Sequence, residues 1–196
     1  MSVTDSRRRG TGPRHDDTHL SEPRPDRTED HGLRLPIAGK YLLAALRFSL
    51  GWVFLWAFLD KTFGWGFATP SEGAWINGGS PTSGFLENAP AGPMADFYNS
   101  LAGQAWVDWV FQIGLLGIGL ALILGVGLRI AAVTGSLLLL MMWSAALPPE
   151  NNPFMDDHLI YAMVLILLPI LAAGRYVGFG GMWGRLPIVK RYSFLK

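Results

Sequence analysis

The sequence contains no cysteine among its 196 residues. This absence excludes disulfides, thiol redox pairs, covalently attached haem and thiolate metal sites built by this chain alone. Charged residues are also scarce, at 16% of the chain, and the net charge is only +1. The basic residues border apolar segments and form no single stripe, so no nucleic-acid partner is expected. Any sulfur or electron chemistry would therefore need a cofactor or a partner protein.

Large apolar side chains are scarce in residues 1–35. A segment of this composition cannot bury enough surface to fold, which predicts a disordered cytoplasmic tail. The segment also lacks the apolar core of a cleaved signal peptide, so we expect the first apolar run to act as an uncleaved anchor. Its histidines are dispersed, and no metal site is expected.

Long apolar runs make up much of the remaining chain, and each approaches the length that crosses a bilayer as a helix. They predict an all-α fold, a four-helix transmembrane bundle over residues 36–175, with the lipid bilayer as its surroundings. A basic cytoplasmic tail is expected over residues 176–196. The four predicted spans cover about 42–59, 105–127, 130–147 and 158–173.

The distribution of basic residues predicts the orientation. Fourteen of the sixteen basic residues lie before the first predicted span, after the fourth or in the connection at Arg129, and the exceptions are Arg47 and Lys61. Lysine and arginine are enriched on the cytoplasmic side of membrane proteins, so both termini are expected in the cytoplasm. The first outer loop is long for a bundle connection, and its proline positions predict short helices near Ser71 and Pro93.

Small residues predict how the second and third spans pack. Gly117, Ala121 and Gly125 recur at every fourth position, which allows close helix approach inside a membrane. Ala131 and Gly135 offer a matching surface on the third span. We therefore expect these two faces to pack against each other.

Three ionisable residues within or beside the spans are candidates for catalysis: Arg47, Asp108 and His158. Charged groups at membrane depth need a partner or a cavity, so Arg47 or Lys61 could pair with Asp108. A structural ion pair, or a side chain that reaches up to the headgroups, would explain Arg47 equally well. The imidazole of His158 exchanges a proton near neutral pH, as a quinol substrate would require, but it could also be a hydrogen-bonded helix cap.

Further polar and aromatic residues gather at the predicted outer ends of the spans. Several share helix faces at a spacing of three or four residues, which predicts a polar, aromatic-lined pocket for a substrate or a quinone. An aromatic belt with solvated loop acids would place the same residue types there without any function. The predicted pocket residues are Trp52, Trp56, Asp60, Lys61, Gln112, Asn151, Asn152, Asp157 and Tyr161.

Two local patterns resemble a known family. Arg47-x3-Gly51-x2-Phe54 leads to Asp60-Lys61, and Asn-Asn-Pro-Phe-x-Asp-Asp-His precedes the last span. Together with the glycine-rich second span, these patterns resemble the DoxX/DoxD family of small bacterial membrane proteins. The similarity covers about residues 42–175 and is greatest to the branch with the membrane subunit of thiosulfate:quinone oxidoreductase. Phe58 stands where that family often has a glycine.

The resemblance implies a multi-pass protein of the bacterial plasma membrane. It would be a redox-associated subunit that acts with the quinone pool, with thiosulfate as one donor. The resemblance also implies that the chain assembles with a small partner subunit or with a second copy of itself. A quinone is the cofactor that it implies. The alternative is a non-enzymatic membrane scaffold or a small transporter, in which Arg47 and Asp108 only hold the helices together.

Overall fold

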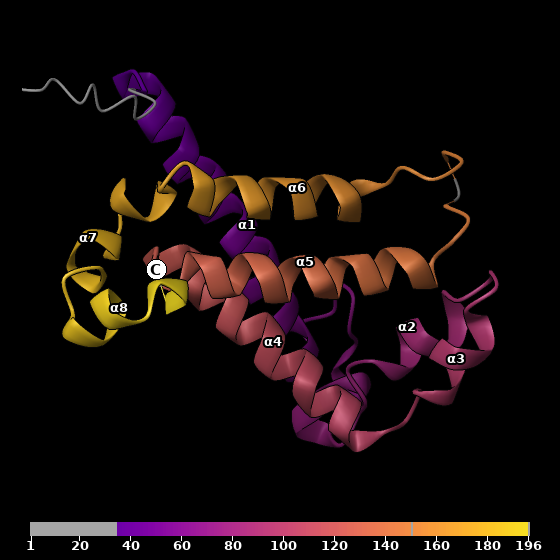
Figure 1. Cartoon of the computed structure of the whole chain (residues 1–196). Coiled ribbons are helices and arrows are strands. Elements are labelled where there is room, and N and C mark those ends of the chain that lie inside the picture. The colour runs from indigo at the N-terminus through magenta and orange to yellow at the C-terminus, as the bar shows by residue number, and fades with distance from the viewer. Residues whose placement is uncertain (1–34, 150, 196) are drawn as a thin grey trace, which may run out of the picture. The chain divides into compact units, whose positions relative to one another are not determined.

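The computed structural model describes residues 35–149 and 151–195, and the predicted tail of residues 1–35 lies outside them except for Leu35. This described part is helical and contains no strand. The four long helices are α1 (Ile37–Phe63), α4 (Ala105–Leu124), α5 (Leu128–Ala145) and α6 (Asp157–Ile170) (Figure 1). The short ones are α2 (Ser83–Asn88), α3 (Ala95–Ser100), α7 (Gly180–Trp183), α8 (Pro187–Arg191) and the 3-10 turns η1 (Ser71–Gly73), η2 (Trp75–Asn77), η3 (Ala173–Arg175) and η4 (Ser193–Leu195).

Three of the long helices, α1, α4 and α5, are long and apolar enough to cross a membrane. Except at its ends, a helix satisfies its backbone hydrogen bonds internally, which is why such apolar runs are stable in lipid. Helix α6 has only 14 residues, or about 21 Å, which is less than the hydrocarbon core of about 30 Å. It ends at Ile170, short of the predicted residue 173, because Ala172 adopts a left-handed conformation with φ of 51°.

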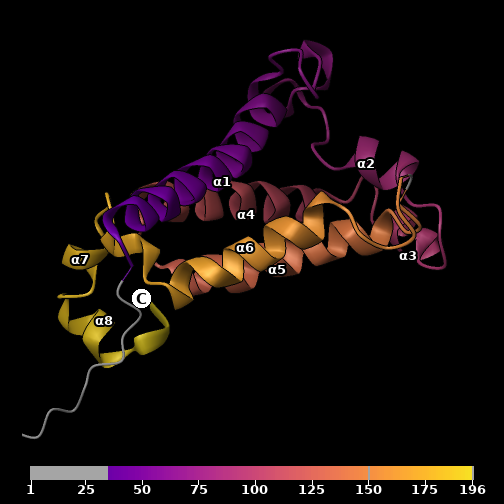
Figure 2. The ribbon, with the colours of Figure 1, turned by 90° about the horizontal axis from the view of Figure 1, so that it is seen from above.

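The long helices pack as two close pairs, α1 with α4 and α5 with α6, and Figure 2 shows α5 beside α6. Glycines allow the first pair to approach closely. A Cβ atom at Gly51 would lie 2.9 Å from Leu122 Cβ, and one at Gly119 would lie 2.9 Å from the backbone nitrogen of Leu55. Helices α1 and α4 are therefore antiparallel and nearly touch along their backbones.

The prediction that the glycine face of the second span packs closely on the small-residue face of the third span is wrong. A Cβ at Gly117 would meet nothing within 4 Å, and Gly125 is the left-handed residue that ends α4. The matching surface on α5 is buried, but a Cβ at Gly135 would lie 2.8 Å from Leu165 of α6. Spacing alone predicted the wrong partner because α4 carries glycines on more than one face.

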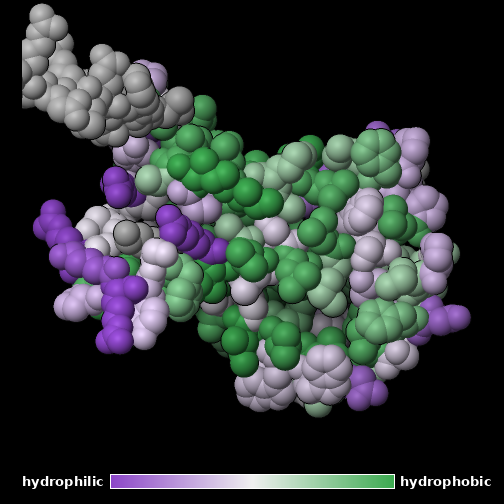
Figure 3. Space-filling model, viewed as in Figure 1, coloured by the Kyte–Doolittle hydropathy of each residue, from purple (hydrophilic) through white to green (hydrophobic). Residues whose placement is uncertain are grey.

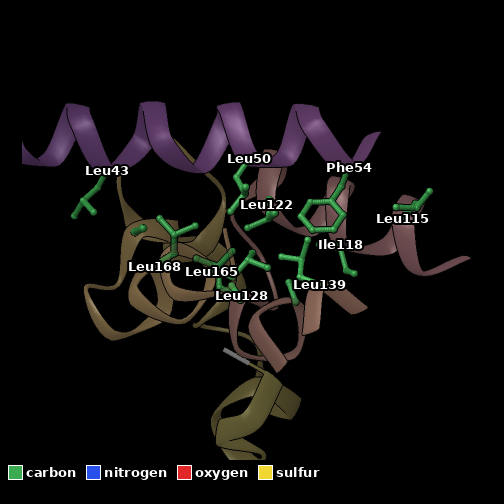
Figure 4. Close-up of a cluster of buried hydrophobic side chains, with 13 residues drawn as sticks. Leu43, Leu50, Phe54, Leu115, Ile118, Leu122, Leu128, Leu139, Leu165 and Leu168 are labelled. Atoms are coloured by element: carbon green, nitrogen blue, oxygen red, sulfur yellow. The ribbon is translucent and has the colours of Figure 1, made fainter. Parts of the chain in front are cut away.

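Leucines and one phenylalanine form the buried core among the four long helices. Figure 4 shows Leu50 and Phe54 of α1 directed toward Leu122, Ile118 and Leu165. Other large apolar side chains, such as those of Val133 and Ile170, lie on the outside. Figure 3 shows this hydrophobic middle, with hydrophilic residues toward the two ends. An exposed apolar band of this kind is typical of a surface that faces lipid.

Short helices cover the end of the molecule where α1 finishes and α4 begins. Leu86 of α2 and Tyr98 of α3 pack on Ala145 at the end of α5, and the Tyr98 hydroxyl lies 2.6 Å from Ser144 Oγ. The short helices predicted near Ser71 and Pro93 correspond to η1 and α3. They position the loop against the ends of α4 and α5.

The residues after 175 fold onto the long helices, within a compact unit that begins at Leu35. Val189 of α8 is fully buried, and the Trp183 indole donates to the Leu195 carbonyl at 2.6 Å. Arg129 at the start of α5 donates to the Ser193 carbonyl at 2.8 Å. The segment that composition set apart as a basic tail is therefore part of the folded unit.

Candidate functional site

Arg47 is fully buried and joins three parts of the chain. One guanidinium nitrogen donates to the carbonyl of Leu122 and, at 2.8 Å, to that of Ile123 in the last turn of α4. The other nitrogen donates to the Tyr176 carbonyl at 3.3 Å and to the Val177 carbonyl at 2.8 Å. The last carbonyls of a helix lack partners inside it and carry its negative dipole end, so a cation satisfies both requirements. Arg47 thus holds α1, α4 and the C-terminal segment together.

Val177 carries backbone strain that Arg47 helps to hold. Its φ of 49° places a β-branched residue in the left-handed region, which such residues rarely adopt. The hydrogen bond from Arg47 to the Val177 carbonyl fixes this turn after η3. Arg47 stabilises the strained turn, and the turn supplies a hydrogen-bond acceptor to Arg47.

Asp108 is buried at the opposite end of α4 and does not pair with Arg47. Its Oδ1 accepts from Ser80 Oγ at 2.8 Å, from Thr82 N at 3.1 Å and from Thr82 Oγ1 at 2.6 Å. Fourteen residues of α4 separate Asp108 from Leu122, which is about 21 Å along the axis. The predicted ion pair between Arg47 and Asp108 is therefore wrong. Asp108 instead anchors the loop before α2.

Asp60 and Gln112 also make structural contacts. The Asp60 carboxylate accepts from the backbone nitrogens of Phe67 at 3.4 Å and Ala68 at 3.0 Å, so it anchors the loop after α1. The Gln112 amide is fully buried between α1 and α4 and donates to Thr62 Oγ1 at 3.1 Å. The four-residue spacing of Asp108 and Gln112 correctly predicts that both side chains lie on one buried face.

His158 lies at the start of α6 in a cluster with two acids. Its Nδ1 is 2.7 Å from Asp156 Oδ2 and 3.5 Å from Asp157 Oδ1. Asp156 is also the helix cap, since its other oxygen accepts from Leu159 N at 3.2 Å. Asp156 is therefore the helix cap, and His158 is not the cap itself but is hydrogen-bonded to it.

The other residues of that connection have local roles or lie on the surface. Asn152 Oδ1 accepts from the backbone nitrogens of Phe154 and Met155, forming a turn. Asn151 and Asp157 are exposed, and Tyr161 packs against the core. Among the described residues, Arg47, Asp108 and His158 share no hydrogen bond or ion pair with one another.

The tryptophans of α1 belong to an aromatic cluster on the outside of the helix. The Trp56 ring lies 5.7 Å from Trp52, 5.4 Å from Trp65 and 5.1 Å from Phe67, measured between centroids. Half of the Trp52 surface is exposed. Partly exposed, tilted aromatic rings at a helix end are typical of a membrane-interface belt.

A groove between α4 and α5, with α2 and α3 at one end, encloses a volume of about 530 Å³. We call it the α4–α5 groove. Its walls are almost wholly apolar, and Lys61 is the only charged residue among them. The lining residues are Lys61, Pro81, Thr82, Phe85, Leu86, Tyr98, Leu101, Trp106, Val107, Val110, Phe111, Ile113, Gly114, Ile118, Thr134, Leu137, Leu138, Met141 and Met142.

Lys61 is the one residue of the predicted pocket that lines this groove. Its Nζ lies 5.9 Å from the centroid of the Phe111 ring and makes no hydrogen bond or ion pair with any described residue. An ammonium at the end of an apolar groove can donate to a carbonyl or an anionic oxygen of an amphipathic ligand. The other lining residues have no signature in the sequence, because apolar residues of a groove and of a lipid-facing surface have the same composition.

Comparison of the chain with protein-family models, curated proteins and solved structures gives no match.

Proposed function

We propose that this is a membrane protein whose α4–α5 groove binds a quinone, and that it serves as a membrane subunit acting with the quinone pool. The observation that carries the proposal is the apolar groove of about 530 Å³ with a single ammonium, Lys61. The isoprenoid tail of a quinone would lie along Val110, Leu137 and Met141, and a quinone carbonyl would accept from Lys61. Binding sites for small amphipathic ligands combine such apolar walls with a few polar groups.

The electrons for quinone reduction would come from a partner subunit. The chain has no cysteine, and its buried polar residues already hold loops and helix ends. The resemblance to the DoxX/DoxD family supports a redox partner of this kind, with thiosulfate as one donor, at the bacterial plasma membrane. The chain would then supply the quinone site and the anchor, and the partner would supply the redox centre.

Three substitutions test the groove with purified protein and a photoreactive quinone. Lys61→Met removes the hydrogen-bond donor, and we expect quinone affinity to fall about tenfold or more, as for loss of a charge-assisted hydrogen bond. Gly114→Leu places a side chain where a Cβ meets nothing within 4 Å, so it would fill the groove and also reduce labelling.

Gly117→Leu is the matched control for Gly114→Leu. Gly117 lies on the same helix and is equally open, but it does not line the groove. We expect it to label like the original protein. If all three variants were labelled by the photoreactive quinone as strongly as the original protein, the α4–α5 groove would not be the quinone site.

We further propose that α6 is a fourth crossing, extended by the segments beside it, and that both termini lie in the cytoplasm. The distribution of basic residues supports this orientation. In this cysteine-free chain, Glu87→Cys and Asn151→Cys should react with an impermeant maleimide in intact cells, whereas Ser193→Cys should react only after lysis. All three native side chains are exposed, so accessibility does not bias the comparison. If only Ser193→Cys were labelled in intact cells, the termini would lie outside the cytoplasm, opposite to the proposed orientation.

A non-enzymatic scaffold is the second candidate function. It is favoured by the structural roles of Arg47, Asp60 and Asp108, which leave none of them free for catalysis. A near-ultraviolet spectrum of the purified protein distinguishes the two functions. A quinone absorbance band that disappears on chemical reduction supports the quinone site. A spectrum without such a band supports the scaffold.

A further inference from the structure

A second cavity, of about 350 Å³, lies at the opposite end of α4 and α5 from the short helices α2 and α3. It is formed by the α4–α5 turn, the end of α6 and α7, and we call it the arginine cavity. Its charged residues are three arginines, Arg129, Arg175 and Arg185. The remaining lining residues are Gly125, Leu128, Pro169, Ala172, Gly174, Gly180, Gly181, Trp183 and Gly184.

No aspartate or glutamate of the described residues forms an ion pair with the arginines of this cavity. No aspartate or glutamate occurs anywhere after Asp157 in the sequence. Arg129 is held in place through its bond to the Ser193 carbonyl, and the side chains of Arg175 and Arg185 make no hydrogen bond or ion pair with any described residue. Guanidinium groups present several donors in a plane and bind phosphate oxygens in pairs.

Glycines bring the three backbone segments of the cavity together. A Cβ at Gly180 would lie 2.6 Å from the Gly174 carbonyl carbon and 2.7 Å from the Gly125 carbonyl oxygen, so α7, η3 and the α4–α5 turn touch through their backbones. At Gly181, by contrast, a Cβ would meet nothing within 4 Å. The cavity is thus closed on one side by backbone and open at Gly181.

The segment that carries the cavity also exposes large apolar side chains. Phe179, Met182, Leu186 and Ile188 lie on the surface around α7 and α8, beside exposed arginines. In Figure 3, hydrophilic residues of this C-terminal region lie next to the hydrophobic middle of the long helices. Short segments with apolar and basic residues side by side lie at the membrane interface, where the phosphates of lipids are found.

We propose that the arginine cavity binds the phosphate of an anionic phospholipid. Arg129, Arg175 and Arg185 would contact the phosphate oxygens, and the acyl chains would lie along the exposed apolar side chains near α7. The site is separate from the α4–α5 groove, so it does not depend on quinone binding. A lipid bound here would contact the α4–α5 turn, the end of α6 and α7 together, and it would stabilise the fold by binding only the folded state.

The test is the thermal stability of the delipidated full chain in neutral detergent, with added lipid. Phosphatidylglycerol should raise the melting temperature by several degrees, whereas phosphatidylcholine, whose headgroup has no net charge, should not. Inorganic phosphate at the same concentration separates the two sources of the anion. An equal rise with inorganic phosphate would overturn the assignment to a lipid.

Single substitutions then locate the site. Arg175→Gln and Arg185→Gln should each weaken phosphatidylglycerol binding about tenfold, because each removes a paired contact to phosphate. Lys190→Gln is the matched control, since Lys190 is exposed on α8 but does not line the cavity. The result that would overturn the proposal is the same loss for Lys190→Gln as for the arginine variants, or no response to phosphatidylglycerol at all.

Discussion

Replacing Arg47 by leucine is expected to lower the free energy of unfolding by about 3–5 kcal/mol, the range seen when one partner of a buried charged contact is removed. The substitution removes the side-chain donor from the carbonyls of Leu122, Ile123, Tyr176 and Val177, and of these the Leu122 carbonyl keeps a bond from Gly125 N at 3.2 Å. Each unsatisfied buried carbonyl costs about 1–3 kcal/mol, less what relaxation recovers. Denaturant titration of the purified protein in detergent measures the loss.

Two controls show whether the loss comes from the carbonyl contacts. Arg47→Lys keeps the charge but not the planar set of donors, so it should lose less than Arg47→Leu. The double variant Arg47→Leu with Asp108→Ala should be additive within about 0.5 kcal/mol, because the two residues contact different ends of α4. If the double variant were more stable than Arg47→Leu alone, Arg47 and Asp108 would be an ion pair after all, contrary to the contacts described above.

The second large effect is expected for Gly119→Ala, which should cost about 1–3 kcal/mol through overpacking. A Cβ at this position would lie 2.9 Å from Leu55 N and 3.1 Å from Leu55 Cα, both backbone atoms of α1. Backbone cannot rotate away as a side chain does, so α1 and α4 would have to separate. That separation would also displace the contact between Gly51 and Leu122.

Gly117→Ala is the matched control on the same helix. Its Cβ would meet nothing within 4 Å, so alanine should be neutral or stabilise the helix by about 0.5–1 kcal/mol. Thermal melts of both variants in the same detergent measure the difference. If Gly117→Ala were the more harmful of the two, the face with Gly117, Ala121 and Gly125 would be the tight interface after all.

The structural roles of the polar residues narrow the search for chemistry. Asp60 and Asp108 anchor the loops at one end of the helices, and Arg47 joins α4 to the C-terminal segment at the other. By contrast, the side chains of Lys61 in the α4–α5 groove and of Arg175 and Arg185 in the arginine cavity make no hydrogen bond with a described residue. Both sites suit amphipathic ligands that are supplied by the membrane itself.

The sequence by itself determined that this is a helical protein with segments long and apolar enough to span a membrane. Apolar runs of about 20 residues leave few alternatives, because lipid offers no hydrogen-bond partner to any backbone that is not helical. The burial of Asp108 and Gln112 also followed from their spacing on α4. The cost of an arginine in an apolar run left three outcomes open for Arg47, a partner, a cavity or a path to the headgroups, and the structure shows partners.

Only the tertiary structure decided which partners those are. Every residue carries a carbonyl, so the acceptors of Arg47 at Leu122 and Val177 have no signature in the sequence. Glycines on several faces of α4 left the choice of neighbour open, and packing selected Gly119 for α1. The α4–α5 groove also had no signal, because the same apolar residues face lipid or line a cavity according to how two helices diverge.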